Sequence, residues 1–230
     1  MIDLKTKKAV FFDFGDTLVT TIETYPKRIE LAFAENGYLF KENEFIEAYH
    51  YSDYEIFSNY KKSGAIRQNE HQNILFDLLI KNLGTKNLDF KDDYSKLKLN
   101  IRKSLGKIEY KRKKIPGCDE LLSLLKKKGL TLAVISNNDG HTAKKCRGTG
   151  IDNYFDVIVD STKVKMVKPD VKIFNYILDK LKLKREETVH IGDLYGSDIL
   201  GAMNSGIDPV WINHRNCKNY DNLNITTVKD

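Results

Sequence analysis

Short apolar runs that alternate with helical patterns limit the fold of this chain more than any other feature. Beyond Pro116 and Gly117, four apolar runs are separated by segments whose apolar residues recur with helical spacing; the runs are 130–136, 154–159, 188–192 and 209–212. Strands that alternate with helices form a parallel sheet covered by helices, and such sheets bind ligands at the carboxyl ends of their strands. We therefore predict an α/β fold in which 209–212 is the last strand.

A further strand is predicted at 8–14, an apolar and aromatic run that delivers Asp13 near its end. From 20 to 114 the pattern is helical throughout. Pro26 suits the first turn of a helix that ends near Asn36, and three more helical patterns follow, at 45–60, 74–84 and 97–101. We therefore predict an α/β core made of 1–19 and 115–230, with an all-helical domain, 20–114, inserted after the first strand.

Composition excludes several classes of protein. The chain has 230 residues, and none of its apolar stretches approaches the roughly 20 residues that a membrane span needs. The N-terminus carries an early charge and no apolar run, which argues against a signal peptide. Its three cysteines, Cys118, Cys146 and Cys217, lie far apart in the sequence, which argues against a disulfide framework or a zinc site and suits a reducing cytoplasm.

The net charge of +6 does not by itself indicate nucleic-acid binding, because the basic residues are interleaved with acidic ones. The one dense basic run, Lys111 to Lys114, is interpreted as a solvated linker. A mild positive field would favour small anionic substrates. We therefore expect a small-molecule substrate, with neither nucleic acid nor a membrane as partner, and a monomer or homodimer.

Four polar clusters stand where predicted strands end; they are 13–18, 136–138, 168–170 and 192–198. Asp13, Asp193 and Asp198 supply the hard oxygen ligands that suit Mg²⁺. Lys168 supplies a cation and Ser136 a hydroxyl donor for phosphoryl oxygens. A carboxylate near Mg²⁺ can attack phosphorus and form an aspartyl-phosphate, and catalysis then rests on positioning and charge neutralisation. Together the clusters indicate a phosphoryl-transfer site.

The order of these motifs resembles that of the haloacid dehalogenase superfamily. Asp-x-x-x-Thr-Leu begins at Asp13, Ser-Asn at Ser136 and Lys-Pro-Asp at Lys168, and Gly-Asp-x-x-x-x-Asp ends at Asp198. Each motif alone is weak, but the ordered set is specific and covers the whole chain. The resemblance implies a Rossmann-like core with a helical cap, whose closure would exclude water and select the substrate.

The resemblance also implies roles for these residues. Asp13 is then the nucleophile and a Mg²⁺ ligand. Ser136 and Lys168 bind the transferring phosphoryl group and orient Asp13. Asp193 binds Mg²⁺, and Asp198 supports the ion directly or through water.

One position departs from the family. Its phosphatases usually carry an Asp two residues after the nucleophile, which protonates the leaving oxygen and later activates water; here that position is Gly15, followed by Asp16. The backbone carbonyl of Gly15 can still serve as a Mg²⁺ ligand. General acid–base catalysis is worth roughly 10²–10⁴-fold. Three hypotheses follow: Asp16 is the substitute acid/base, the leaving group needs little protonation, or the chain binds a phosphorylated ligand without turnover.

Other polar residues receive structural interpretations. Asp170 is interpreted as the N-cap of the next helix. Asn137 and Asn138 are interpreted as loop-shaping residues, with Asn137 also a candidate phosphoryl contact. His190 is interpreted as a buried structural histidine. The remaining histidines show no metal-ligand spacing and are assigned to the surface or to packing; they are His50, His71, His141 and His214.

The leading hypothesis is a Mg²⁺-dependent phosphohydrolase for a small phosphorylated metabolite. A 2-haloacid dehalogenase is the second, because halide leaves without a proton and Gly15 would be explained. Displacement at carbon needs no Mg²⁺, however, which would leave Asp193 and Asp198 without a role. The third is a non-catalytic phosphate-binding protein on the same scaffold. In all three cases we expect the cap to select the ligand. Any of the tyrosines of the cap could line the ligand site.

Overall fold

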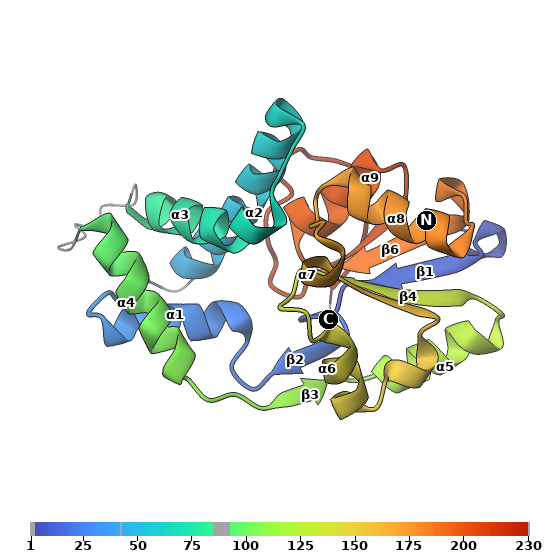
Figure 1. Ribbon diagram of the computed structural model, residues 1–230, viewed down its shortest axis with the longest axis horizontal. Helices are drawn as coiled ribbons and strands as arrows, with labels where there is room; N and C mark the ends of the chain where they lie inside the picture. Colours follow the sequence, from blue (N-terminus) through green and yellow to red (C-terminus); the bar gives the residue numbers. More distant parts are fainter. Residues whose placement is uncertain (1–2, 42, 85–92, 230) are drawn as a thin grey trace.

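The computed structural model describes residues 3–41, 43–84 and 93–229. Its centre is a six-stranded parallel sheet in the order β5-β4-β1-β6-β7-β8 (Figure 1). The strands are β1 (Ala9–Phe12), β4 (Thr131–Ser136), β5 (Val157–Asp160), β6 (Thr188–Gly192), β7 (Asp208–Ile212) and β8 (Thr226–Val228). In the middle, Phe12 of β1 pairs with Val134 on one side and Ile191 on the other. The predicted α/β fold with a Rossmann-like parallel sheet is confirmed.

Helices cover both faces of this sheet, because successive strand residues point to opposite sides. Val10 and Phe12 share a hydrophobic cluster with α5 (Cys118–Lys127) and α6 (Thr142–Thr149). Ala9 and Phe11 share another with α8 (Val171–Leu181) and α9 (Gly201–Asn204). Figure 1 shows the two pairs of helices on opposite sides of the sheet. Burial from both sides explains why β1 is a continuous apolar run.

The core differs from the prediction in three places. The strand expected at 154–159 begins only at Val157, after a 3-10 turn at Asp152–Tyr154. The helical segment predicted between the strands at 188–192 and 209–212 begins as a π-helix, η5 (Tyr195–Leu200), which α9 continues. One more strand, β8, follows the strand that was predicted to be the last. The prediction missed β8 because three residues at a sheet edge carry too little apolar pattern to be recognised. The remaining short helical elements are α7 (Ser161–Val164) and 3-10 turns at Leu4–Thr6 and Arg185–Glu187.

The basic run at 111–114 is largely exposed to solvent, as predicted, but most of it is a strand and not an irregular linker. Its last three residues form β3 (Arg112–Lys114), which pairs antiparallel with β2 (Val19–Thr21) so that Thr20 lies opposite Lys113. These two strands carry the chain out of the core and back. The sequence did not predict these strands. Their residues are mostly polar and show no strand pattern, and the two paired segments lie far apart in the sequence.

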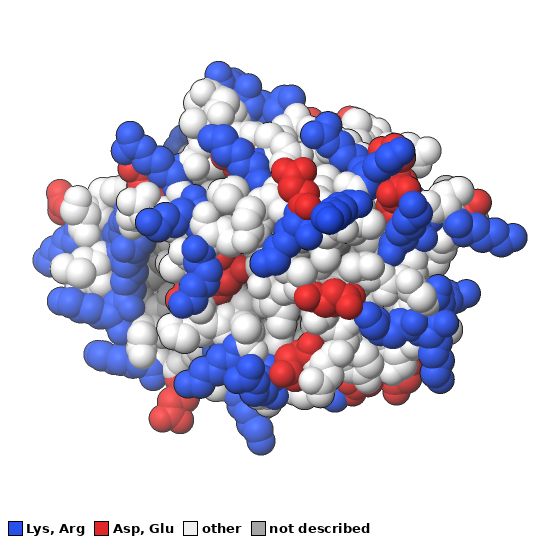
Figure 2. Space-filling model, turned by 45° about the vertical axis from the view of Figure 1, so that its right-hand side comes forward, with Lys and Arg blue, Asp and Glu red and all other residues white. Residues whose placement is uncertain are grey.

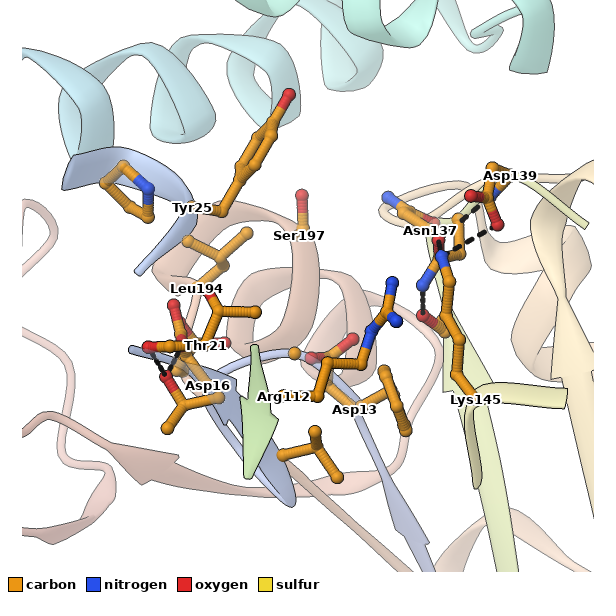
Figure 3. A pocket seen from close by; sticks show the side chains of 18 of the residues that line it. Asp13, Asp16, Thr21, Tyr25, Arg112, Asn137, Asp139, Lys145, Leu194 and Ser197 are labelled. Atoms are coloured by element: carbon orange, nitrogen blue, oxygen red, sulfur yellow. Dashed lines mark hydrogen bonds and ion pairs between the residues drawn. The ribbon is translucent and has the colours of Figure 1, made fainter. Parts of the chain in front are cut away.

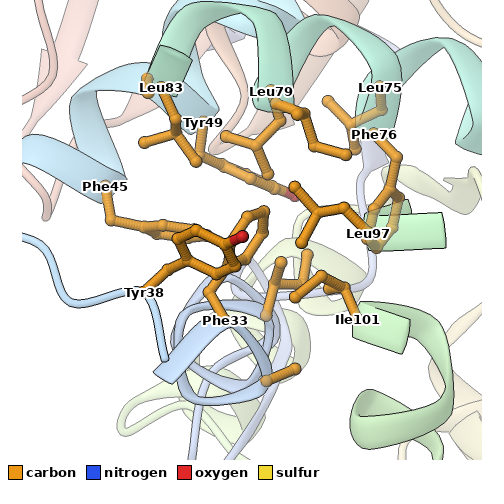
Figure 4. Packing of buried hydrophobic residues seen from close by; sticks show 14 of the residues in the cluster. Phe33, Tyr38, Phe45, Tyr49, Leu75, Phe76, Leu79, Leu83, Leu97 and Ile101 are labelled. Atoms are coloured by element: carbon orange, nitrogen blue, oxygen red, sulfur yellow. The ribbon is translucent and has the colours of Figure 1, made fainter. Parts of the chain in front are cut away.

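The segment between β2 and β3 is helical, as predicted. Its helices are α1 (Tyr25–Glu35), α2 (Glu44–Ser63), α3 (His71–Gly84) and α4 (Tyr94–Lys107), with a 3-10 turn, Gln68–Glu70, before α3. They surround a hydrophobic cluster of their own, in which Figure 4 shows Phe33, Tyr49, Leu79 and Leu97, one from each helix. The amphipathic patterns read from the sequence therefore face one another across this cluster.

The surface carries both signs of charge. On the face shown in Figure 2, lysine and arginine side chains are spread widely, with aspartate and glutamate among them. On this face the positive charge of the chain is therefore distributed rather than gathered in one place.

Within the described ranges, no helix combines the length and the apolar character needed to cross a bilayer. All three cysteines are free, and Cys118 and Cys146 are buried.

One buried carboxylate joins α2 to the core. Asp53 accepts hydrogen bonds from the backbone N–H groups of Gly196 (2.6 Å) and Ser197 (3.1 Å), and from the hydroxyl of Ser197. These donors lie at the start of η5, where N–H groups without helical partners attract negative charge. Burial raises the pKa of Asp53 to about 6, although the hydrogen bonds from Ser197 and Gly196 oppose this shift. The helical segment is thus anchored to the element that follows β6.

Gly196→Ala is expected to lower the free energy of unfolding by about 1–3 kcal/mol, the usual cost of overpacking. A Cβ at this position would lie 2.3 Å from the backbone oxygen of Asp53, so α2 or η5 would have to move. Urea unfolding of the variant and of wild type measures the effect. The control is Gly148→Ala in α6, where an added Cβ meets nothing within 4 Å and alanine favours the helix. Wild-type stability of Gly196→Ala would contradict this close approach.

Candidate active site

The predicted polar clusters meet at the carboxyl edge of the sheet. Asp13 follows β1, Ser136 ends β4 and Asp193 follows β6, and these strands are neighbours. Together with Lys168 they line one cavity of about 320 Å³. Figure 3 looks into this cavity, with Asp13 on the side of the core and Tyr25 on the side of the helices.

Lys168 lies between two of the predicted carboxylates. Its Nζ atom is 2.6 Å from Oδ1 of Asp13 and 2.6 Å from Oδ1 of Asp198, and its side chain is almost completely buried. A buried ammonium group needs such partners, because an unpaired charge in the protein interior is costly. The two ion pairs hold the end of β1, the loop before α8 and η5 together at one point.

Burial and charge act in opposite directions on these three groups. Burial raises the pKa of Asp13 to about 6, although Lys168 lowers it. Burial also disfavours the charged form of Asp198, but Lys168 and His190 outweigh it and bring this pKa to about 2. Burial lowers the pKa of Lys168, but the two carboxylates outweigh it and raise the value above its ordinary range. At neutral pH the site therefore holds a cationic lysine beside ionised carboxylates.

Asp198 has further partners inside the core. Nε2 of His190 lies 3.1 Å from Oδ1 of Asp198, and His190 is completely buried, as predicted. The backbone N–H of Leu194 donates to Oδ2 at 3.1 Å. Gly192 leaves the room that this arrangement needs, because a Cβ there would lie 2.3 Å from Cγ of Asp198. Both oxygens of Asp198 are thus fixed by surrounding donors.

Three carboxylates form the candidate metal site. Asp13, Asp193 and Asp198 each offer an oxygen within 4.8 Å of the others, and all three side chains are buried. Burial raises the pKa of Asp193 well above its ordinary range; Arg215 opposes this shift, and the neighbouring carboxylates reinforce it. A divalent cation would relieve this repulsion, and carboxylate oxygens are the ligands that Mg²⁺ prefers. The residues present therefore fit a Mg²⁺ ion.

Asp16, the candidate substitute acid/base, lines the cavity but is held on two sides. Its backbone is left-handed (φ 53°), and its N–H donates to the carbonyl of Val19 at 2.8 Å. Its Oδ1 accepts a hydrogen bond from Thr20 at 2.6 Å, and its Oδ2 forms an ion pair with Arg215. Gly15 also lines the cavity, and a Cβ added there would meet no atom within 4 Å. The contacts of Asp16 are those of a loop-shaping residue.

Arg215 is a residue that the sequence analysis missed. It lies after β7, and its guanidinium group contacts Oδ2 of Asp193 at 2.7 Å and the carboxylate of Asp16. Burial disfavours this cation, but the two carboxylates outweigh it and raise the pKa of Arg215 further. The one signal in the sequence is its position after the strand predicted at 209–212, whose carboxyl end reaches the same edge of the sheet.

The residues at the carboxyl end of β4 differ from one another in what they contact. Asn137 holds the backbone of Lys168: its Nδ2 donates to the carbonyl at 2.9 Å, and its Oδ1 accepts from the N–H at 2.9 Å. Both polar atoms of this side chain thus bind a neighbouring loop, and Asn137 also lines the cavity, so its contact with a phosphoryl group stays a prediction. Ser136 lines the cavity, and its hydroxyl accepts a hydrogen bond from Asn138 at 3.3 Å.

Asp170 caps α8, as predicted, by accepting a hydrogen bond from the N–H of Lys172 at 2.9 Å. It also accepts one from the hydroxyl of Tyr60 in α2 at 3.2 Å, which is a second tie between the helical segment and the core. The histidines assigned to packing or to the surface include two that are buried, His50 and His71, and the exposed His141.

Residues of the helical segment and of the strands beside it form the opposite wall of the cavity. Tyr25 and Arg28 of α1, Tyr49 of α2, and Tyr110 and Arg112 at β3 line it. Three of the tyrosines in the predicted cap region therefore line this cavity. In Figure 3, Arg112 extends into the space between Asp13 and the helices.

Comparison with known proteins bears on this geometry. The model of the family described as haloacid dehalogenase-like hydrolase matches residues 10–212. The chain belongs to this family. The match spans all four motifs and the helical insert, so the resemblance inferred from the sequence and the hydrolase class are confirmed.

Relatives of this hydrolase include a glyceraldehyde 3-phosphate phosphatase from Methanothermobacter thermautotrophicus, 34% identical over 142 residues, which are 55% of this chain and 62% of that protein. The chain spans about half the length of the curated relatives it matches. Among solved structures, the putative HAD-hydrolase YfnB from Bacillus subtilis, bound to magnesium, aligns with a TM-score of 0.59 and 23% identity over 97% of this chain and 94% of that one. An L-2-haloacid dehalogenase from Xanthobacter autotrophicus aligns with a TM-score of 0.55 and 19% identity over 90% and 78%. At such identities the structures show a shared fold.

Asn137→Ala is expected to lower the free energy of unfolding by about 1–3 kcal/mol, because two hydrogen bonds to the backbone of Lys168 are lost at about 1 kcal/mol each. Urea unfolding measures this loss. The control is Asn153→Ala at an exposed position, which should leave stability unchanged. Unchanged stability of Asn137→Ala, together with weaker phosphate binding, would support a phosphoryl contact instead.

Proposed function

We propose that this chain is a Mg²⁺-dependent phosphohydrolase that acts on a small phosphorylated metabolite through an aspartyl-phosphate at Asp13. The observation that carries the proposal is the buried group of Asp13, Lys168 and Asp198 beside Asp193. It combines a nucleophilic carboxylate, a cation for phosphoryl oxygens and oxygen ligands for a metal. The phosphatase named among its relatives supports the class of substrate.

In the proposed reaction an oxygen of Asp13 attacks phosphorus, and the bond from phosphorus to the leaving oxygen breaks with its electron pair on that oxygen. Lys168 and Ser136 hold the other phosphoryl oxygens and offset their charge. Water then attacks phosphorus, inorganic phosphate leaves, and the carboxylate of Asp13 is restored. Mg²⁺, held by Asp13, Asp193, Asp198 and the carbonyl of Gly15, would supply further neutralisation of charge on the phosphoryl group.

Proton transfer to the leaving oxygen is the step in which we propose that this chain differs from its family. Thr20 and Arg215 already engage the carboxylate of Asp16. We therefore assign Asp16 to the shape of the loop and not to proton transfer. A site without a carboxylic acid at position 15 suits a leaving group that needs little protonation, such as that of an anomeric or acyl phosphate.

We also propose that 20–114 acts as the cap of a core formed by 1–19 and 115–230. Helices α1–α4 have a hydrophobic cluster of their own, and their residues supply one wall of the cavity. A wall of this kind excludes water and selects the substrate. The free cysteines support a reducing compartment, the cytoplasm, as the location.

A 2-haloacid dehalogenase is the second candidate. Gly15 favours it, because a halide leaves without a proton, and the fold is shared with an L-2-haloacid dehalogenase. The cluster of three carboxylates counts against it, because displacement at carbon needs no cation to offset phosphoryl charge.

Hydrolysis of p-nitrophenyl phosphate tests the proposed function, since nitrophenolate leaves readily without a proton. Wild type is expected to release it only with Mg²⁺, and Asp13→Asn to lose at least about 10³-fold in rate, which corresponds to ~4 kcal/mol of barrier. The control is Asp139→Asn, which changes a cavity-lining carboxylate that pairs with Lys145 and lies outside the metal cluster.

Two results would contradict the proposed function. Release of halide from chloropropionate with no turnover of phosphates would support the dehalogenase. Binding of phosphate or beryllofluoride without turnover of any phosphate ester would support the non-catalytic protein.

Gly15→Asp is expected to raise the rate on alkyl phosphates by about 10²-fold or more, because it supplies a general acid, and to change p-nitrophenyl phosphate hydrolysis little. An added side chain has open space on the cavity wall. Gly15→Asn is the matched control, which has the same size but no titrating proton. Steady-state rates with ethyl phosphate measure the gain, and equal rates for the Asp and Asn variants would show that Asp16 or another group already supplies the proton.

A further inference from the structure

Arg28 is a buried cation on the wall of the cavity that contains Asp13. It lies in α1, its side chain lines the cavity, and only 8% of its surface is exposed. Taking a guanidinium group out of water is unfavourable unless acceptors replace the water.

No side chain or backbone group in the described part of the protein accepts a hydrogen bond from the guanidinium group of Arg28. Its Nε atom is buried and has no hydrogen-bond partner there, and the group forms no ion pair with a described carboxylate. Two other cations that line the cavity are paired: Lys168 with Asp13 and Lys145 with Asp139. Arg28 thus differs from the cations on the core side of the cavity.

Aromatic rings hold Arg28 in place instead. Its guanidinium group lies over the ring of Tyr110, 3.8 Å from the centroid, and 5.5 Å from that of Tyr25. Such stacking orients the group by its flat face and leaves the N–H donors at its edge for another partner. Burial raises the pKa of Tyr25, so its hydroxyl stays neutral beside the cation.

Arg112 contacts the same tyrosine. Its guanidinium group is 5.0 Å from the centroid of the Tyr110 ring and donates to the Tyr110 hydroxyl at 3.0 Å. Arg112 also lines the cavity and, like Arg28, forms no ion pair with a carboxylate of the described residues. The guanidinium groups of Arg28 and Arg112 both contact Tyr110, and their positive charges repel each other. No described carboxylate pairs with either group, so a bound anion would offset this positive charge.

We propose that Arg28 and Arg112 form a subsite for a second anionic group of the substrate, a carboxylate or a phosphate. The inference rests on the proposed function, because the first anionic group is the phosphoryl group held at Asp13 and Lys168. Guanidinium groups bind both kinds of anion through paired N–H donors. The substrate is then a small molecule with the transferred phosphoryl group at one end and a second negative group at the other.

Matched ligands and direct binding test this subsite without relying on turnover. Calorimetry on Asp13→Asn with Mg²⁺ compares phosphoglycolate with ethyl phosphate, phosphoserine with phosphoethanolamine, and ethylene glycol bisphosphate with its monophosphate. In at least one pair the ligand with the second anion should bind about ten-fold tighter or more, as charge-assisted hydrogen bonds imply. A preference in the first two pairs identifies a carboxylate, and one in the third pair a phosphate.

Variants then assign the preference to the two arginines. Arg28→Gln and Arg112→Gln, each made in the Asp13→Asn protein, should lower affinity for the preferred ligand to that of the paired ligand without the second anion. Affinity for that paired ligand should not change. The control is Arg102→Gln in α4, where the guanidinium group stacks on Phe76 outside the cavity. Urea unfolding identifies a variant that fails to fold, and Arg112 on the short strand β3 then remains as the second test.

Two outcomes would overturn the subsite: equal affinities within all three pairs, or a preference that survives in both folded variants. Failure of the proposed function is a separate result. A wild-type protein that does not hydrolyse p-nitrophenyl phosphate would refute the phosphohydrolase, while the binding preference and its loss in the arginine variants would still be measured.

Discussion

The ammonium group of Lys168 is nearly excluded from solvent, and a charge in that position is stable only with carboxylates at its side. Asp13 and Asp198 provide them, so the end of β1, the loop before α8 and the helix η5 must converge. The surrounding residues serve this convergence. Gly192 leaves space for Asp198, and Asn137 holds the backbone of Lys168. The geometry of the candidate site is therefore set as much by residues that would never contact a substrate as by those that would.

A second buried charge controls how the helical segment meets the core. Asp53 of α2 receives its hydrogen bonds from the first residues of η5, and the same element carries Asp198. Helix α2, which lines one side of the cavity, is thus bound to η5, which carries the candidate metal ligand Asp198 on the other side. A displacement of α2 would also move Asp198, because α2 and η5 are closely packed at Gly196.

The two walls of the cavity have different chemistry. On the side of the core, cations and carboxylates neutralise one another, as at Lys168 and Arg215. On the side of the helices, Arg28 is stacked on Tyr110 and has no carboxylate partner among the described residues. This division suits a reaction centre whose charges are preorganised on one wall and a recognition surface on the other, whose charge is completed by the ligand.

Much of the core could be predicted from the sequence, because its signals are local. An apolar run such as 8–14 indicates a buried strand wherever it occurs, and the polar residues that follow such strands, Asp13 and Asp193 among them, must reach the same edge of a parallel sheet. The family resemblance added roles to these positions and pointed to Gly15 as the departure.

Only the tertiary structure decided how distant residues combine. Asp53 contacts Gly196 across 143 positions, and Arg215 contacts Asp16 across 199. The pairing of β2 with β3 and the placing of Arg28 beside Tyr110 are of the same kind. Periodicity describes which face of an element is buried, but it carries no information about which element covers that face. The sequence by itself therefore determined the type of sheet and the residues at its carboxyl edge, whereas packing between distant segments decided which charges are paired and which are left for a ligand.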